Sequence, residues 1–212
     1  MKTFDFGYGP VPAHRHSNGR GWVANTASVK ASAYVGDNAR VSGSARVSES
    51  ARIFELAHVS GSACVSGSAQ IYGLAHVYGS ACVYGSAHVL GLACVYESAR
   101  VFGLACVSGS ARVLGSACVY GSAHVFGSAC VSEYVYGIRR SDGHIFICVR
   151  CADGQRRILA GCRYFTMPEA REHWKKTRDG TPLGQETMMI LDLLELQLST
   201  RKLGGKDASK DQ

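Results

Sequence analysis

The chain has 212 residues, a formal net charge of +7 at pH 7 and a mean hydropathy close to zero. This length suits one elongated repeat domain and one small second domain, and so modest a charge concerns solubility and does not indicate nucleic-acid binding. No run approaches the roughly 18 apolar residues of a membrane span, and the first twelve residues lack the apolar core of a signal peptide, so we predict no membrane partner.

Residues 1–22 precede a long repeat and carry alternating aromatic residues. Phe4, Phe6 and Tyr8 are spaced by two, and Trp22 lies next to the first repeat residue, Val23. Because the end of a repetitive fold exposes its core and has to be covered, we expect residues 1–22 to form an N-terminal cap.

Residues 23–133 are built from an unbroken six-residue repeat. From Val23 to Val131 an aliphatic residue recurs at every sixth position, 19 times in all, and 18 of these have an alanine two residues earlier. A period of six fits neither a helix nor a simple strand, but it suits a short strand plus a turn. Alternate residues of a strand share a face, so the alanine and the aliphatic residue both point inward.

The segment from Val35 to Val41, with the sequence VGDNARV, resembles the hexapeptide-repeat left-handed β-helix family. In that family three hexads close one triangular coil of 18 residues, so the 18 hexads imply about six coils. The fold class implied is mainly β: a left-handed parallel β-helix of about six coils with a small α+β C-terminal domain. The narrow interior leaves no room for a ligand.

Residues 134–203 change character and predict that α+β domain. We expect a hairpin with strands at residues 144–150 and 157–160 and a turn at residues 152–154. Thr166 and Glu169 form a capping-box pattern with a proline between them, which predicts a helix to about Lys176. A second helix is expected over residues 185–199 with most of its surface buried, and residues 204–212 are predicted to be a disordered tail.

The first candidate site is an apolar surface on the repeat. Residues 18 apart should stack in columns on successive coils. One column of outward residues and the column of turn residues beside it are apolar, whereas the equivalent positions elsewhere mostly hold serine. Contiguous apolar surface marks an interface, and the family usually forms trimers, so we predict a homotrimer. The predicted interface residues are Phe54, Leu56, Tyr72, Leu74, Leu90 and Leu92.

The second candidate site lies in the C-terminal domain, where arginines are close in sequence to aromatic residues. Such a group suits a phosphate, a nucleotide-like ligand or an acidic protein surface, although a solvated basic face around a buried Trp174 is the simpler interpretation. The candidate residues are Arg139, Arg140, Arg163, Tyr164, His173 and Trp174.

Many proteins of the resembled family are acyltransferases with a histidine base between subunits. Four repeat histidines point outward, but no loop leaves the repeat and no carboxylate neighbours them in sequence, so we predict no catalytic residue. They are His58, His76, His88 and His124.

Stacked histidine and cysteine columns raise the possibility of zinc. Stacked side chains run parallel and do not converge, so we predict no metal site and no cofactor. Six of the nine cysteines point outward, where oxidation would cross-link molecules, which favours a reducing cytoplasm. These six are Cys64, Cys82, Cys94, Cys106, Cys118 and Cys130.

The stretch from Ala160 to Thr166, followed by Ala170, His173 and Trp174, resembles a small module of phage and prophage proteins. Together these features predict a non-enzymatic, phage-type binding or scaffold protein that grips a host protein or a small phosphorylated ligand, with a role in countering host defence. Two alternatives stay open: an acyltransferase with His76 or His88 as base, and a purely structural self-assembling protein.

Overall fold

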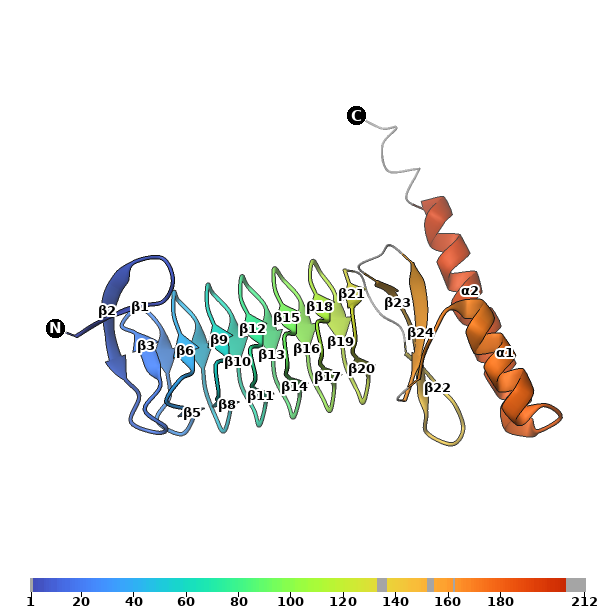
Figure 1. Ribbon diagram of the computed structural model, residues 1–212, viewed down its shortest axis with the longest axis horizontal. Helices are drawn as coiled ribbons and strands as arrows, with labels where there is room; N and C mark the ends of the chain where they lie inside the picture. Colours follow the sequence, from blue (N-terminus) through green and yellow to red (C-terminus); the bar gives the residue numbers. More distant parts are fainter. Residues whose placement is uncertain (1, 133–136, 152–154, 162, 205–212) are drawn as a thin grey trace, which may run out of the picture. The chain divides into compact units, whose positions relative to one another are not determined.

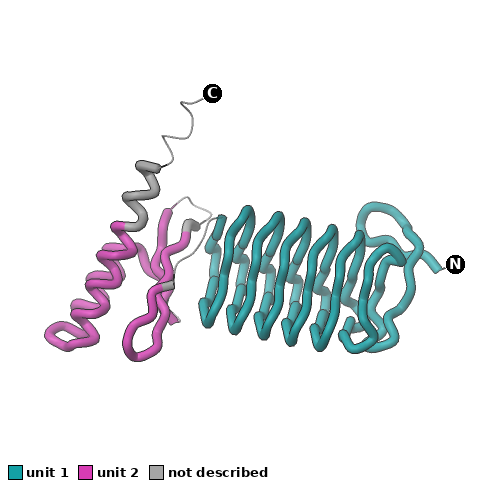
Figure 2. The backbone as a smooth tube through the Cα atoms, turned by 180° about the vertical axis from the view of Figure 1, so that it is seen from behind, with its two compact units in different colours: residues 1–135, 150–153 teal, residues 136–149, 154–212 magenta. Residues whose placement is uncertain are grey.

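The structure is a computed structural model that describes residues 2–132, 137–151, 155–161 and 163–204. The chain divides into two compact units (Figure 2): residues 1–135 with 150–153, and residues 136–149 with 154–212.

Unit 1 is a parallel β-helix of about six coils (Figure 1), which confirms the β-helix predicted from the hexads. Its strands form three sheets. The first contains β3 (Trp22–Ala24), β6 (Arg40–Val41), β9 (His58–Val59), β12 (His76–Val77), β15 (Cys94–Val95), β18 (Arg112–Val113) and β21 (Ala129–Val131). The second contains β4 (Ser28–Val29), β7 (Arg46–Val47), β10 (Cys64–Val65), β13 (Cys82–Val83), β16 (Arg100–Val101) and β19 (Cys118–Val119). The third contains β5 (Tyr34–Val35), β8 (Arg52–Ile53), β11 (Gln70–Ile71), β14 (His88–Val89), β17 (Cys106–Val107) and β20 (His124–Val125).

The interior of the coil is filled by the two inward positions of each hexad. From Ala33 to Val131 every repeat alanine and aliphatic residue is at most 6% exposed. Strands 18 residues apart pair in parallel and in register, as Val77 does with Val59 and Val95. The predicted inward face is therefore confirmed, and the outward residue of every hexad is placed by the same register.

The turns between strands explain the recurrent glycines. Gly73 has φ +74, and a Cβ atom there would lie 2.8 Å from the backbone nitrogen of Gly91 on the next coil. Only glycine accepts both the left-handed backbone and this close stacking without strain.

An N-terminal hairpin, β1 (Thr3–Asp5) and β2 (Pro10–Arg15), lies at the start of the first sheet, where β2 pairs antiparallel with β3. Phe6 is 4% exposed and packs with Ala13 and Ala24, while the Phe4 ring stacks on Trp22 at 4.6 Å between centroids. The hairpin thus covers the first strand of that sheet with apolar side chains.

Unit 2 contains β22 (Gly137–Arg139), β23 (Ile145–Cys151, whose last two residues cluster with unit 1), β24 (Arg156–Ala160), β25 (Arg163–Phe165), α1 (Met167–Arg178) and α2 (Pro182–Gly204). The two predicted strands correspond to β23 and β24, and the predicted turn at residues 152–154 lies outside the described residues. β22 and β25, each three residues long, were not foreseen from the sequence.

The first predicted helix is confirmed with its capping box: Thr166 and Glu169 bond reciprocally at the start of α1. The expectation that most of the second helix surface is buried is wrong for this chain. Met189, Leu193 and Leu196 are 69%, 45% and 59% exposed, because only one side of α2 contacts other elements of the unit. The predicted tail lies outside the described residues, except that Gly204 ends α2.

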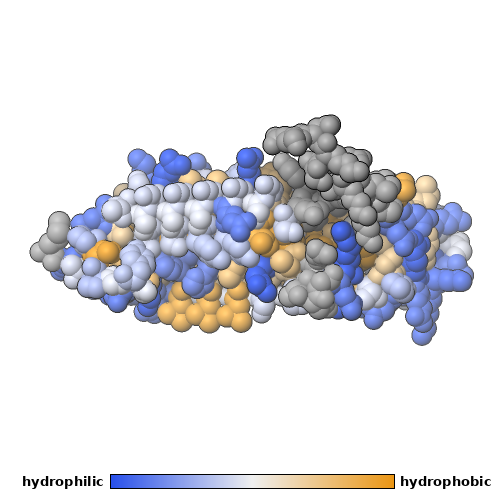
Figure 3. All heavy atoms as spheres, turned by 90° about the horizontal axis from the view of Figure 1, so that it is seen from above, coloured by the Kyte–Doolittle hydropathy of each residue, from blue (hydrophilic) through white to orange (hydrophobic). Residues whose placement is uncertain are grey.

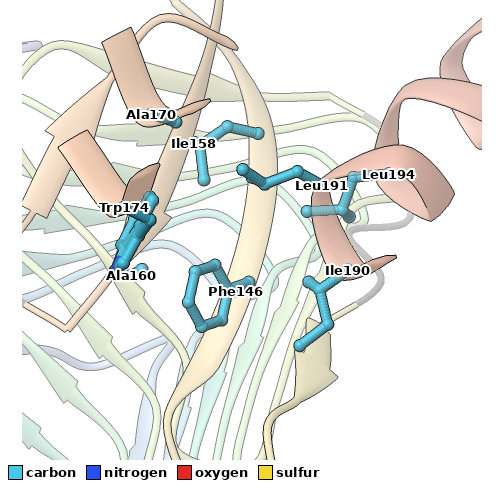
Figure 4. Close-up of a cluster of buried hydrophobic side chains, with 8 residues drawn as sticks. All are labelled: Phe146, Ile158, Ala160, Ala170, Trp174, Ile190, Leu191 and Leu194. Carbon is cyan, nitrogen blue, oxygen red and sulfur yellow. The ribbon is translucent and has the colours of Figure 1, made fainter. Parts of the chain in front are cut away.

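The core of unit 2 joins its sheet to both helices (Figure 4). It contains Phe146, Ile158, Ala160, Ala170, Trp174, Ile190, Leu191 and Leu194. Trp174 is 5% exposed and its ring lies 5.0 Å from that of Phe146. Neither helix is long and apolar enough, over its described residues, to cross a bilayer.

Candidate functional site

A hollow of about 380 Å³ opens on the surface of unit 2. Phe146, Ala160 and Trp174, three residues of the core, contribute to its wall. The polar residues that line it are Arg140, His144, Arg163, His173, Thr177 and Arg178. Four of the six residues predicted as a ligand site, Arg140, Arg163, His173 and Trp174, therefore lie around one hollow.

Arg140 is held within the protein and is not available as a free cation. Its side chain is 3% exposed, and its Nε and Nη2 donate to the two carboxylate oxygens of Asp142 at 2.9 and 2.6 Å. Nη1 donates to Thr187 Oγ1 at 2.9 Å, and the guanidinium lies 5.3 Å from the Phe146 ring centre. Arg140 therefore anchors the β22–β23 turn to α2.

Asp142 also orients His144. His144 Nδ1 lies 3.1 Å from Asp142 Oδ2, which directs the opposite edge of the ring away from the carboxylate. The two hydrogen bonds from Arg140 hold the pKa of Asp142 well below its usual range, with a further backbone hydrogen bond from His144. Asp142 is therefore ionised at neutral pH, and its charge is compensated by Arg140.

Arg163 and Arg178 supply uncompensated positive charge at the hollow. Both are exposed, and neither has a carboxylate within ion-pair distance among the described residues. The His173 ring packs against Phe165 and Trp174, with centroids 4.9 and 5.4 Å away. The hydroxyl of Thr177 is already used, since it donates to the His173 carbonyl at 2.8 Å.

The other two predicted ligand residues are not among those that line the hollow. Arg139 is exposed on β22. Tyr164 lies between Arg163 and Phe165 on β25, so its side chain points to the opposite face of the sheet, where the guanidinium of Arg157 lies 5.4 Å from its ring centre.

Two further residues that line the hollow, His144 and Arg178, were not predicted from the sequence. The signals available were the Asp142-Gly143-His144 turn, in which an aspartate commonly bonds to residues two positions later, and the basic last turn of α1.

The three predicted interface leucines at the turns form a regular exposed column on unit 1, whereas Phe54, Tyr72 and Leu90 are half-buried. Leu56, Leu74 and Leu92 are 52%, 47% and 56% exposed, at the same turn position of three successive coils. The Phe54 and Tyr72 rings beside them are parallel, with centroids 4.9 Å apart. Figure 3 shows a hydrophobic cluster along one edge of the coil.

The four repeat histidines differ in their surroundings. Among the described residues, no carboxylate pairs with His58, His76, His88 or His124. His58 differs from the expected surface histidine: Phe6 stacks over it at 6.3 Å, and Ser42 Oγ lies 3.0 Å from its Nε2. Burial, with smaller effects of His76 and Arg40, lowers the pKa of His58 to about 4.

Within the described parts of the chain, no group of three or more histidine, cysteine, aspartate or glutamate side chains is arranged to hold a metal ion. No protein-family model, curated protein or solved structure matches this chain.

Proposed function

We propose that this chain is a non-enzymatic scaffold and binding protein, whose C-terminal unit binds a small phosphorylated ligand. The observation that carries this proposal is the hollow in unit 2, where the free guanidinium groups of Arg163 and Arg178 flank an aromatic wall. Guanidinium groups bind phosphate oxygens with two parallel hydrogen bonds. The half-buried ring of His173 also lines the hollow, where Trp174 and Phe146 are only 5% and 1% exposed. A planar ring beside the guanidinium groups suits a ligand with a phosphate and a flat body.

The test is calorimetric titration of the full chain with inorganic phosphate and with a nucleoside monophosphate. We expect the nucleotide to bind more tightly than phosphate alone, and the double variant Arg163→Ala with Arg178→Ala to lose both. Arg139→Ala is the matched control, because Arg139 is exposed nearby but does not line the hollow. Equal binding by the double variant and the control would refute the proposal.

We further propose that the β-helix forms a homotrimer through Phe54, Leu56, Tyr72, Leu74, Leu90 and Leu92. A contiguous exposed apolar column of this kind is typical of an interface. Native mass spectrometry should give a trimer for the wild type and a monomer for Leu74→Glu. Leu104→Glu is the control, because Leu104 is 67% exposed at a turn outside this column. Filaments in electron micrographs would instead favour the purely structural alternative.

From the resemblance we propose that the chain is a hexapeptide-repeat protein of phage or prophage origin. We propose that the protein acts in the reducing cytoplasm, in keeping with its half-exposed free cysteines. Its proposed partner there is a host protein or a metabolite of a defence system. Acyl transfer with His76 or His88 as base is the rival function. Turnover of an acyl-coenzyme A that is lost in His76→Ala or His88→Ala would establish that rival.

A further inference from the structure

The second sheet of the coil brings two cysteines directly together. Cys64 on β10 is the register partner of Cys82 on the adjacent parallel strand β13. Cys94 instead lies between His76 and Arg112, and Cys106 lies between His88 and His124. Among the register pairs of the described strands, Cys64 with Cys82 is the one that joins two cysteines.

The spacing of this pair is wide for a disulfide. Neighbouring strands lie about 4.8 Å apart, and outward side chains stand roughly perpendicular to the sheet, so the two Cβ–Sγ bonds leave the sheet in parallel at about that separation. In disulfides the Cβ atoms lie about 3.5–4.5 Å apart, with a mean of about 3.8 Å. The coil would have to contract locally, by about 1 Å to reach that mean, to close one.

The same spacing matches two metal–sulfur bonds in line. A metal–thiolate bond is about 2.3 Å long for zinc, so a linear sulfur–metal–sulfur unit spans about 4.6 Å. With the two Cβ–Sγ bonds perpendicular to that line, the angle at each sulfur is close to a right angle, as two-coordinate thiolates accept. Zinc needs four converging ligands, which the column lacks; a two-coordinate ion needs only this pair.

The charges beside the pair fit an anionic complex. Arg46 Nη2 donates to Cys64 Sγ at 3.3 Å, and Arg100 is the register partner of Cys82 on its other side. Two thiolates around a monovalent cation carry one net negative charge, and a guanidinium stands at each end of the pair to balance it. Both sulfurs are half-buried, so they are shielded yet accessible.

We propose that Cys64 and Cys82 form a two-coordinate thiolate site for a soft monovalent cation, copper(I) being the ion that such ligands select. Each thiol releases its proton to solvent as the ion binds, so two protons leave for each copper(I) gained and no electron is transferred. This site is independent of the phosphate-binding hollow.

The test uses the full reduced chain, titrated anaerobically with copper(I) against a chromogenic copper(I) chelator, and X-ray absorption of the loaded protein. We expect one equivalent to be withdrawn from the chelator and held by two sulfur atoms. Cys64→Ser and Cys82→Ser should each abolish it, and Cys118→Ser, at the end of the same column, should keep it. Serine already occupies this column at Ser28, so these variants should fold, which circular dichroism checks.

Arg46→Ala gives a second, milder readout. Removing this outer-shell donor should weaken copper(I) binding about tenfold while leaving two sulfur ligands. The proposal is overturned if the bound equivalent persists in both serine variants, or if its ligands include nitrogen. Rapid closure of a Cys64–Cys82 disulfide by diamide would also contradict the spacing on which it rests.

Discussion

The β-helix and the C-terminal unit position their polar side chains in different ways. In the coil, register places each outward residue above an equivalent one, so Tyr78 stacks on Tyr96 with rings 4.9 Å apart and parallel within 1°. In unit 2, residues distant in sequence meet, as Arg140 and Thr187 do. A stacked column holds its side chains parallel, whereas a packed fold brings different groups to one point. Sites that need converging ligands are therefore expected in unit 2.

The variant Trp174→Ala should have the largest effect on stability and tests this contrast most directly. Trp174 is 5% exposed and contacts Phe146 and Phe165 in a core that lies within unit 2. Truncating a buried aromatic residue costs about 3–5 kcal/mol, so calorimetry should show the transition of unit 2 shifting sharply while that of the coil stays in place.

The matched change in the coil is Ile71→Val, which restores the commonest residue of the repeat. It should cost about 0.5–1.5 kcal/mol and move only the coil transition. A single transition that both variants shift together would show that the two units unfold as one.

The next effect concerns the charge pair that supports the hollow. The pKa of Asp142 lies well below the usual range of an aspartate because Arg140 donates two hydrogen bonds to its carboxylate. This interaction is complete above about pH 4 and is lost as the pH falls toward the lower folded-state pKa. The unfolding midpoint of unit 2 should fall between pH 5 and pH 3, measured by urea denaturation.

In Asp142→Asn most of that acid sensitivity should disappear, and the variant should already be less stable at pH 5, because the buried Arg140 loses its counter-charge. Asp179→Asn, in the turn after α1, is the control. An unchanged slope with pH in Asp142→Asn would mean that the Arg140 pair does not stabilise unit 2.

The same contrast explains how far the sequence predicts this molecule. An unbroken six-residue repeat determines both the strand register and which side chains point inward, so the burial of Ala75 and Val77 follows from their positions in the repeat. In unit 2 the sequence located the strands and the start of α1, because a capping box is a local signal. It could not show that Arg140 is buried against Asp142, since that depends on where α2 packs. It also overestimated the burial of α2, because Met189 and Leu193 are apolar but face outward.

His58 is the place where the coil itself departs from simple register. Its column predicts a surface position, yet the N-terminal hairpin adds Phe6 above it. Burial lowers the pKa of His58 to about 4 in the folded protein. As the pH falls below about 6.5, His58 is therefore protonated in the unfolded chain while it stays neutral in the folded one. Stability of the coil should therefore fall on the order of 1 kcal/mol from pH 7 to pH 5, after allowing for partial exposure.

In His58→Gln the free energy of unfolding of the coil, measured by chemical denaturation, should no longer fall between pH 7 and pH 5. In His76→Gln, which changes an exposed neighbour, the fall should remain. Phe6→Ala sharpens the test, because uncovering the ring should raise the pKa of His58 in an NMR titration. A normal His58 pKa in the wild type would mean that the hairpin does not cover the column.

The smallest effects concern glutamates that replace turn glycines in the coil. Glu49 and Glu55 both have positive φ, 59° and 58°, a conformation that costs a non-glycine residue about 1 kcal/mol. They differ in one contact: Glu55 Oε2 accepts a hydrogen bond from the Gly73 backbone N–H at 2.7 Å.

Glu49→Gly relieves backbone strain alone and should stabilise the coil by up to about 1 kcal/mol. Glu55→Gly also loses a hydrogen bond worth about 1 kcal/mol and should leave the stability nearly unchanged. Thermal unfolding of the two variants isolates that bond, and an equal gain in both would show that the side-chain contact across coils contributes nothing.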